Sequence, residues 1–170
     1  MNTIARVGVD PAKHVLQVHA VDSAGNVITN RALARGKFVE WCVQLPSGRL
    51  VAMEASSGAH FWSRKLIAMG LHARIIPGPL AAPYRLQGRG GKNDANDAAA
   101  ICEAASGPQM HFVPPKTVAQ QGTLCVHRLR EGVGRANSLY QSNPRPAGGV
   151  RGRARSCVDA FRSVCSQDVN

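Results

Sequence analysis

The stretch Ile4-Ala5-Arg6-Val7-Gly8-Val9-Asp10 decides the fold. It is apolar or alternates between apolar and polar residues, which is typical of a strand buried in a sheet. An aspartate closes it, and Leu50-Val51-Ala52-Met53-Glu54 repeats the arrangement with a glutamate at its end. Two buried strands that each end in a carboxylate favour an open α/β sheet, because such sheets build their sites at strand ends.

The elements around these two strands predict the order of the sheet. Residues 14–21 alternate, Ser23-Ala24-Gly25-Asn26 is typical of a hairpin turn, and residues 27–30 return as a third strand. The later segments have helical or strand patterns and are, in order, a helix containing residues 38–45, the strand 50–54, a helix over 58–69 and a strand over 71–76. The order βββ, α, β, α, β predicts a ribonuclease H-like α/β fold, a mixed sheet flanked by helices.

Four of the ten acidic residues fall at element ends. Asp10 and Glu54 close strands, whereas Asp94 and Asp97 precede the helix-forming residues 98–105. Residues three apart on a helix share a face. Hard divalent cations such as Mg²⁺ or Mn²⁺ prefer oxygen ligands, and carboxylates that hold them can serve phosphoryl transfer. Acids at strand ends also cap helices or form surface ion pairs, so their positions leave both interpretations open.

The charge of the chain indicates a polyanionic partner. Its 170 residues carry 21 Lys and Arg against 10 Asp and Glu, a formal charge of +11, and nucleic acid is the polyanion that this balance favours. The glycine-rich segment 84–91 and its flank carry Arg85, Arg89 and Lys92, which we expect to contact a nucleic-acid backbone or to be solvated. Lys13, beside the first acid, is a further candidate for phosphate contact.

The compartment is predicted from cysteines and hydropathy. Five cysteines at wide spacings, with no CxxC pair, suit reduced thiols. No run is long and apolar enough for a membrane span, and the first residues lack a signal-peptide pattern. We therefore expect a cytoplasmic protein that does not bind membranes.

The carboxyl-terminal part has a different composition. Residues 117–131 have a helical pattern and carry Arg128 and Arg130, two further candidates for nucleic-acid contact. Residues 132–170 contain six Arg, no Lys and no sustained periodicity. The sequence thus predicts a domain over residues 1–131, which includes the start of a helical connection, and an irregular tail over 132–170.

Four motifs in order resemble the DEDD-type insertion-sequence transposases, the family that also contains the Piv-type DNA invertases. They are Gly8-Val9-Asp10-Pro11-Ala12-Lys13, Met53-Glu54-Ala55 leading into Ser57-Gly58-Ala59-His60-Phe61-Trp62, Lys92-Asn93-Asp94-Ala95-Asn96-Asp97-Ala98, and Phe112-Val113-Pro114 with Gln120-Gln121 and His127-Arg128-Leu129-Arg130. The resemblance covers residues 6–131. It implies a Holliday-junction-resolvase-like domain of the ribonuclease H type, in which Asp10, Glu54, Asp94 and Asp97 are the catalytic and metal-binding tetrad. It also implies recombination of DNA, directed in some members by a structured RNA, and a homo-oligomer.

The departure from the family concerns the residues after Glu131. Members continue into a helical connection and a transposase domain that carries a serine nucleophile, and neither is found in residues 132–170. The Arg-rich, aperiodic composition there is what a shifted reading frame in a GC-rich gene would give. We therefore expect a truncated or frameshifted transposase copy that is not competent alone.

Two other functional classes fit part of the sequence. A non-catalytic nucleic-acid-binding module would use the fold and the charge while the acids only hold structure. Actin-like and sugar-kinase phosphotransferases also begin with a strand that ends in Asp, but they follow it with glycine and hydroxyl residues. Here Pro11-Ala12-Lys13 follows, and no glycine-rich phosphate loop of the P-loop type occurs. Metal binding by the four acids separates the recombinase from the binding module.

Overall fold

The computed structural model describes residues 3–11, 14–56, 58–85 and 94–142, with side chains up to residue 132. The chain divides into two compact units, Met1–Pro115 and Lys116–Asn170. The strands are β1 (Arg6–Pro11), β2 (Val15–Val21), β3 (Val27–Ala34), β4 (Leu50–Glu54) and β5 (His72–Ile76). The helices are α1 (Arg35–Val43), α2 (Ala59–Ala68), α3 (Gly78–Ala81), the 3₁₀ turn η1 (Ala82–Tyr84), α4 (Asp94–Ala104) and α5 (Val118–Ser142).

The first unit contains a mixed five-stranded sheet in the order β3-β2-β1-β4-β5. β1 pairs antiparallel with β2 and β2 antiparallel with β3, whereas β1 with β4 and β4 with β5 are parallel. This arrangement confirms the predicted hairpin layer joined to parallel crossover units, the ribonuclease H-like order. The hairpin turn lies where it was predicted, and Gly25 occupies it with φ of 87°, a conformation that favours glycine.

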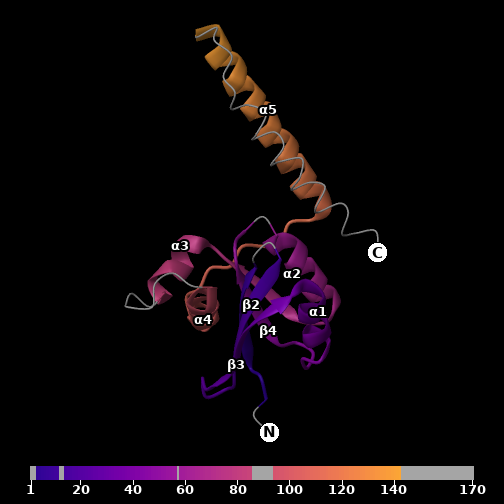
Figure 1. The fold of residues 1–170 in the computed structure, drawn as a ribbon, viewed down its shortest axis with the longest axis vertical. Coiled ribbons are helices and arrows are strands. Elements are labelled where there is room, and N and C mark those ends of the chain that lie inside the picture. Colours follow the sequence, from indigo (N-terminus) through magenta and orange to yellow (C-terminus); the bar gives the residue numbers. More distant parts are fainter. Residues whose placement is uncertain (1–2, 12–13, 57, 86–93, 143–170) are drawn as a thin grey trace. The chain divides into compact units, whose positions relative to one another are not determined.

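Alternating side chains give the sheet two apolar faces. One face carries Val7, Val9, Val51 and Met53, which pack with aromatic residues of α1 and α2 in the larger core. The smaller core on the other face combines residues from the sheet, α3 and α4 with the segment that follows α4; they are Ala52, Ile76, Ala81, Ile101, Ala104 and Ala105. Figure 1 shows α1 and α2 on one side of the sheet and α3 and α4 on the other. Because successive strand residues point to opposite faces, the side chains next to Val9 and Met53 point towards α4.

Two predicted boundaries differ from the structure within the first unit. β3 runs to Ala34 rather than residue 30, because its register against β2 continues as far as the pair Val15 and Ala34. α4 begins at Asp94, so both aspartates lie in the first helical turn rather than ahead of it. Negative side chains stabilise a helix amino terminus, which is the physical reason for the earlier start.

The second unit contains α5, which begins with a capping box and extends further than predicted. The Thr117 amide donates to Gln120 Oε1 at 2.9 Å, and the Gln120 amide donates to Thr117 Oγ1 at 3.2 Å. The helix then runs on to Ser142, so the prediction of irregular chain from Gly132 is wrong for residues 132–142. A glycine in a helix costs only about 1 kcal/mol and does not end it, and the next proline is Pro144. The rest of the predicted tail lies outside the described residues.

Two further expectations concern the redox state of the cysteines and membrane spans. Cys42 and Cys102 are free thiols, while Cys157 and Cys165 lie outside the described residues. Burial raises the pKa of Cys42 to about 12, which keeps that thiol protonated and unreactive at neutral pH. Among the helices of the described segments, none combines the length and apolar character that crossing a membrane requires.

Candidate metal centre

Asp10 and Glu54 lie at the ends of two neighbouring parallel strands. Val9 and Met53 are partners in the β1–β4 register, and the two acids are the next residue on each strand. Since Val9 and Met53 belong to the core under α1 and α2, the acids project to the opposite face, where α4 packs. The register therefore places both strand-end carboxylates at the same edge and on the same face of the sheet.

Gly8 allows α4 to lie directly against β1. A Cβ atom at this position would collide with the carbonyl oxygen of Ala98 and would come within 2.5 Å of the Cys102 amide nitrogen. The backbone of the helix therefore occupies the space that any other side chain would fill. This close approach brings the first turn of α4, with Asp94 and Asp97, to the end of β1.

Three carboxylates meet at this junction. Asp10, Asp94 and Asp97 each offer an oxygen, and these oxygens all lie within 4.8 Å of one another. Asp97 is 7% exposed, Asp10 is partly buried and Asp94 is exposed, so the group opens to solvent on the side of Asp94. Three of the four acids singled out in the sequence are thus brought together by the fold.

Glu54 is not a member of this close group, because an arginine binds it. Arg85 Nη2 lies 2.5 Å from Glu54 Oε2, and Arg85 Nε lies 2.8 Å from Asp97 Oδ1. Arg85 was expected to contact a nucleic-acid backbone or to be solvated; in the structure its guanidinium bridges two acids of the site. Opposite charges at contact distance explain this placement, since the four carboxylates face a single arginine among the described residues.

The electrostatics of the group are those of crowded negative charge. Partial burial raises the pKa of Asp10, and the charges of Asp94, Asp97 and Glu54 raise it further, while Arg85 lowers it. Burial acts to lower the pKa of Arg85, but Glu54 and Asp97 outweigh this, so that its pKa is raised and it stays charged. One guanidinium therefore compensates the acids only in part.

A second glycine shapes the position of Glu54. A Cβ atom at Gly78, the first residue of α3, would lie 2.7 Å from Glu54 Oε1. The carboxylate therefore rests against bare backbone on one side and against Arg85 on the other. This role of Gly78 was not predicted; the Pro77-Gly78-Pro79 stretch after a strand is the signal that the sequence offers for it.

The remaining candidates for nucleic-acid contact belong to the second unit or lie outside the described residues. Lys13, Arg89 and Lys92 belong to segments that the structure does not describe. Arg128 and Arg130 are exposed on α5, in the second unit.

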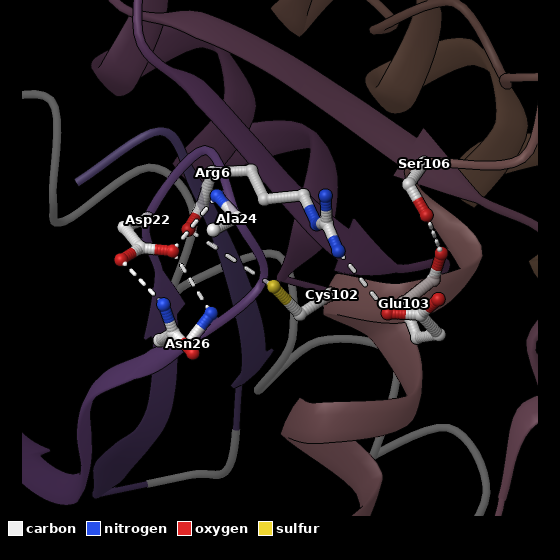
Figure 2. Close-up of polar contacts among 7 residues, drawn as sticks. All are labelled: Arg6, Asp22, Ala24, Asn26, Cys102, Glu103 and Ser106. Carbon is white, nitrogen blue, oxygen red and sulfur yellow. Dashed lines mark hydrogen bonds and ion pairs between the residues drawn. The ribbon is translucent and has the colours of Figure 1, made fainter.

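Two other acids of the chain have local partners instead (Figure 2). Asp22, at the end of β2, accepts hydrogen bonds from the amides of Ala24 and Asn26, each at 2.9 Å, and from Asn26 Nδ2 at 3.0 Å. Glu103, on α4, pairs with Arg6 at 3.1 Å. Neither contributes to the group around Asp10.

The donor set suits a hard divalent cation. Carboxylate oxygens are the ligands that Mg²⁺, Mn²⁺ and Ca²⁺ prefer, and two or three of them with open positions are typical of a site that also binds phosphate. Partial burial is the main cause of the raised pKa of Asp10, and the neighbouring carboxylates add to it; a bound cation would offset the charge of these carboxylates. The residues present therefore fit such an ion.

The chain is similar in sequence to known transposases. A family model described as transposase matches residues 7–132. The chain is 44% identical over 135 residues to a probable family 20 transposase of Pseudomonas aeruginosa, which covers 79% of this chain and 39% of that protein. It is 40% identical over 131 residues to the transposase for insertion sequence element IS1111A of Coxiella burnetii, with 77% and 35% covered. The chain belongs to the DEDD transposase family of the IS110 type, as its motifs predicted.

A third relative matches more of the carboxyl-terminal part. The chain is 38% identical over 163 residues to the putative transposase y4pF/y4sB of Sinorhizobium fredii, and the match covers 95% of this chain and 40% of that protein. This match includes most of residues 132–170, whereas the family model ends at residue 132 and the other two relatives match over 135 and 131 residues. A shifted reading frame after Glu131 stays a prediction. The chain spans about two fifths of the length of these relatives.

Proposed function

We propose that this chain supplies the metal-dependent catalytic part of a DNA transposase, with Asp10, Asp94 and Asp97 as the first ligands of Mg²⁺ or Mn²⁺ and Glu54 as the fourth acid. The observation that carries the proposal is the convergence of three carboxylates within 4.8 Å, from a strand end and a helix start far apart in sequence. Its support is the family to which residues 7–132 belong.

The acidic residues would have different roles in such a site. A bound divalent cation polarises a phosphoryl oxygen and stabilises the charge that develops during strand cleavage and transfer. Asp10 and Asp97 are held by β1 and by α4 against the sheet, so they fix the position of the ligand oxygens. Asp94 lies at the exposed side, from which a DNA phosphate can approach.

DNA is the partner that we propose, with a structured RNA as a further one and a homo-oligomer as the working assembly. The charge of +11 supports backbone contacts through Lys13, Arg89, Lys92, Arg128 and Arg130. We place this activity in the cytoplasm, where a bacterial transposase meets its DNA. The serine nucleophile of the family is expected outside these 170 residues, so we expect no complete strand exchange by this chain alone.

Metal titration tests the core of the proposal. The 170-residue chain is titrated with Mn²⁺ by calorimetry, and its affinity is compared with that of Asp10→Asn and of the Asp94→Asn, Asp97→Asn double variant. We expect each to weaken binding at least about tenfold, because an anionic oxygen ligand becomes a neutral amide.

The matched control is Asp22→Asn, which removes the same charge from a strand end outside the site. Its Mn²⁺ affinity should stay at the wild-type value. If the site variants bind Mn²⁺ as tightly as the wild type, the acids only hold structure and the proposal fails in favour of a binding module.

Salt dependence tests the DNA contact separately. Removing Arg128 and Arg130 together should lower DNA affinity at every sequence and reduce the slope of log affinity against log salt by about 2, since each phosphate contact releases about one counterion. Arg31→Ala, on the edge strand β3, is the control for charge alone. An unchanged slope in the double variant would exclude α5 from the DNA contact.

A further inference from the structure

We propose that Arg85 is an internal cation of the acidic site, which competes with a divalent ion for Asp97 and withholds Glu54 from the other three acids. The inference rests on the proposed metal site and concerns its regulation. Arg85 bridges Glu54 and Asp97 at 2.5 and 2.8 Å, so one side chain links the acid at the end of β4 with the buried acid of α4.

The backbone of Arg85 is fixed in a way that directs its side chain to this place. The Arg85 amide donates to the carbonyl of Ala82 at 3.1 Å and closes the 3₁₀ turn η1. η1 in turn packs against α4, and the hydroxyl of Tyr84 lies next to Gly107, just beyond the carboxyl end of that helix. Arg85 is therefore carried by a segment anchored to the same helix that supplies Asp94 and Asp97.

The charges explain what the guanidinium does there. Asp10, Asp94 and Asp97 converge at this corner, and the Arg85 guanidinium pairs with Asp97 of this group and with the neighbouring Glu54. A guanidinium offers two donors in a fixed fork, which matches two carboxylates better than a lysine ammonium does. In the metal-free chain it stabilises the fold by compensating like charges that would otherwise repel.

The same contacts oppose metal binding. Asp97 belongs both to the ion pair with Arg85 and to the group whose oxygens converge on one point. A divalent cation bound at that point would share Asp97 with the Arg85 guanidinium, and the positive charge of the guanidinium would repel it. Glu54, held between Arg85 and Gly78, stays outside the group until this pair opens. Arg85 is thus a positioning residue that sets how tightly the ion binds and whether the fourth acid joins.

The test compares Mn²⁺ binding by the 170-residue chain and by Arg85→Gln, with Arg31→Gln as the charge-matched control on β3. We expect Arg85→Gln to bind Mn²⁺ about tenfold more tightly, the factor that follows from removing a unit charge close to a dication in a partly solvated site. Arg31→Gln should bind as the wild type does. Arg85→Lys keeps the charge and should stay within about threefold of the wild type.

Thermal unfolding supplies a reading that a merely structural arginine would not give. In EDTA, Arg85→Gln should unfold at a lower temperature than the wild type, because its acids repel without compensation. Saturating Mn²⁺ should then raise its midpoint by more than it raises that of the wild type, since tighter binding to the folded state stabilises it more. A loss of stability that Mn²⁺ does not reverse would indicate a structural role and overturn the inference.

A second pair of variants keeps the test valid if Arg85→Gln fails to fold. Glu54→Gln lacks one acid, and the Glu54→Gln, Arg85→Gln double variant restores the charge balance of the wild type. The double variant should bind Mn²⁺ more tightly than Glu54→Gln alone, because Asp97 is freed. Equal affinities in this pair, or equal gains in Arg85→Lys and Arg85→Gln, contradict competition by charge. If neither the wild type nor any arginine variant binds Mn²⁺, the proposed metal function itself fails.

Discussion

Two aspartates lie at the ends of neighbouring antiparallel strands, and their surroundings differ in one respect. Asp22, after β2, accepts three hydrogen bonds from Ala24 and Asn26 of its own turn, and the Asn26 contacts foremost lower its pKa (Figure 2). Asp10, on β1, is partly buried among other carboxylates, and its pKa is raised. An acidic residue at a strand end is therefore structural when nearby N–H groups donate hydrogen bonds to its carboxylate. It is a candidate metal ligand when other carboxylates surround it.

The two ends of α4 repeat this contrast on a single helix. Glu103, near the carboxyl end, pairs with Arg6 of β1 at 3.1 Å, so charge there is balanced. At the amino end, Asp97 shares Arg85 with Glu54, and Asp10 and Asp94 lie close to Asp97. Within the part of the chain that the structure describes, several carboxylates around one arginine distinguish the candidate site from the rest of the helix.

The largest effect is expected at Gly8, on which both ends of α4 depend. Gly8→Ala places a methyl group against the carbonyl oxygen of Ala98 and the amide of Cys102, so the helix must move away from β1. We expect a loss of at least about 3 kcal/mol in the free energy of unfolding, the upper range for overpacking against rigid backbone. Urea denaturation measures it, and Mn²⁺ binding should fall with it because Asp94 and Asp97 move from Asp10.

Gly36→Ala is the control for this change, since a Cβ atom at Gly36 of α1 would meet nothing within 4 Å. Its unfolding free energy should stay within about 1 kcal/mol of the wild type, or rise, as alanine favours the helix. A Gly8→Ala variant that is as stable as Gly36→Ala would show that α4 does not depend on this contact.

An intermediate effect, with opposite signs, is expected when each of the two strand-end aspartates is neutralised. In EDTA, Asp10→Asn should raise the unfolding midpoint by a few degrees because it relieves repulsion among the acids, whereas Asp22→Asn should lower it because an amide cannot accept all three hydrogen bonds. Differential scanning calorimetry gives both values. Shifts of the same sign would remove the distinction drawn between these residues.

The sequence predicted the sheet well because the alternation that marks each strand is a local pattern, and the relative placement of the strand ends then follows from sheet geometry. Alternation identified the strands, and the acids at the ends of β1 and β4 had to lie at the same edge of the sheet once those strands ran parallel. It could not predict the partner of Arg85, since a basic side chain beside a glycine-rich loop has the same pattern whether it contacts DNA or an internal carboxylate. The role of Gly78 was missed for a related reason: a close approach between side chain and backbone leaves no periodic trace.

The ends of β3 and α5 were predicted wrongly. The first depends on long-range strand pairing, and the second depends on the free-energy cost of breaking a helix. β3 extends because β2 continues to offer partners, and α5 passes Gly132 because one glycine costs less than the hydrogen bonds that follow it. The composition of residues 132–170 favoured an irregular tail, but composition does not show how far a helix continues once its amino terminus is capped. The box formed by Thr117 and Gln120 was the readable signal.

The smallest effect is expected from substituting His19. This residue lies on β2, on the sheet face that packs against α4, near the ion pair of Arg6 and Glu103. His19 pairs in register with Gly8 and is 9% exposed, and burial, followed by the charge of Arg6, lowers its pKa, while Glu103 acts in the other direction. In the unfolded chain the imidazole titrates near its ordinary value of about 6.5, so below that pH the unfolded state binds more protons than the folded one. The stability that the neutral imidazole contributes is therefore present above about pH 6.5 and is lost as the pH falls.

His19→Gln removes this dependence, so its unfolding midpoint should fall less than that of the wild type between pH 7.5 and pH 5.5. His72→Gln, which changes an exposed imidazole on β5, should follow the wild type. Thermal melts at four or five pH values measure the slopes. If His19→Gln keeps the wild-type slope, the pH dependence arises from another group. The region where Glu103 of α4 pairs with Arg6 of β1 would then not be the charge-balanced region that this ion pair indicates.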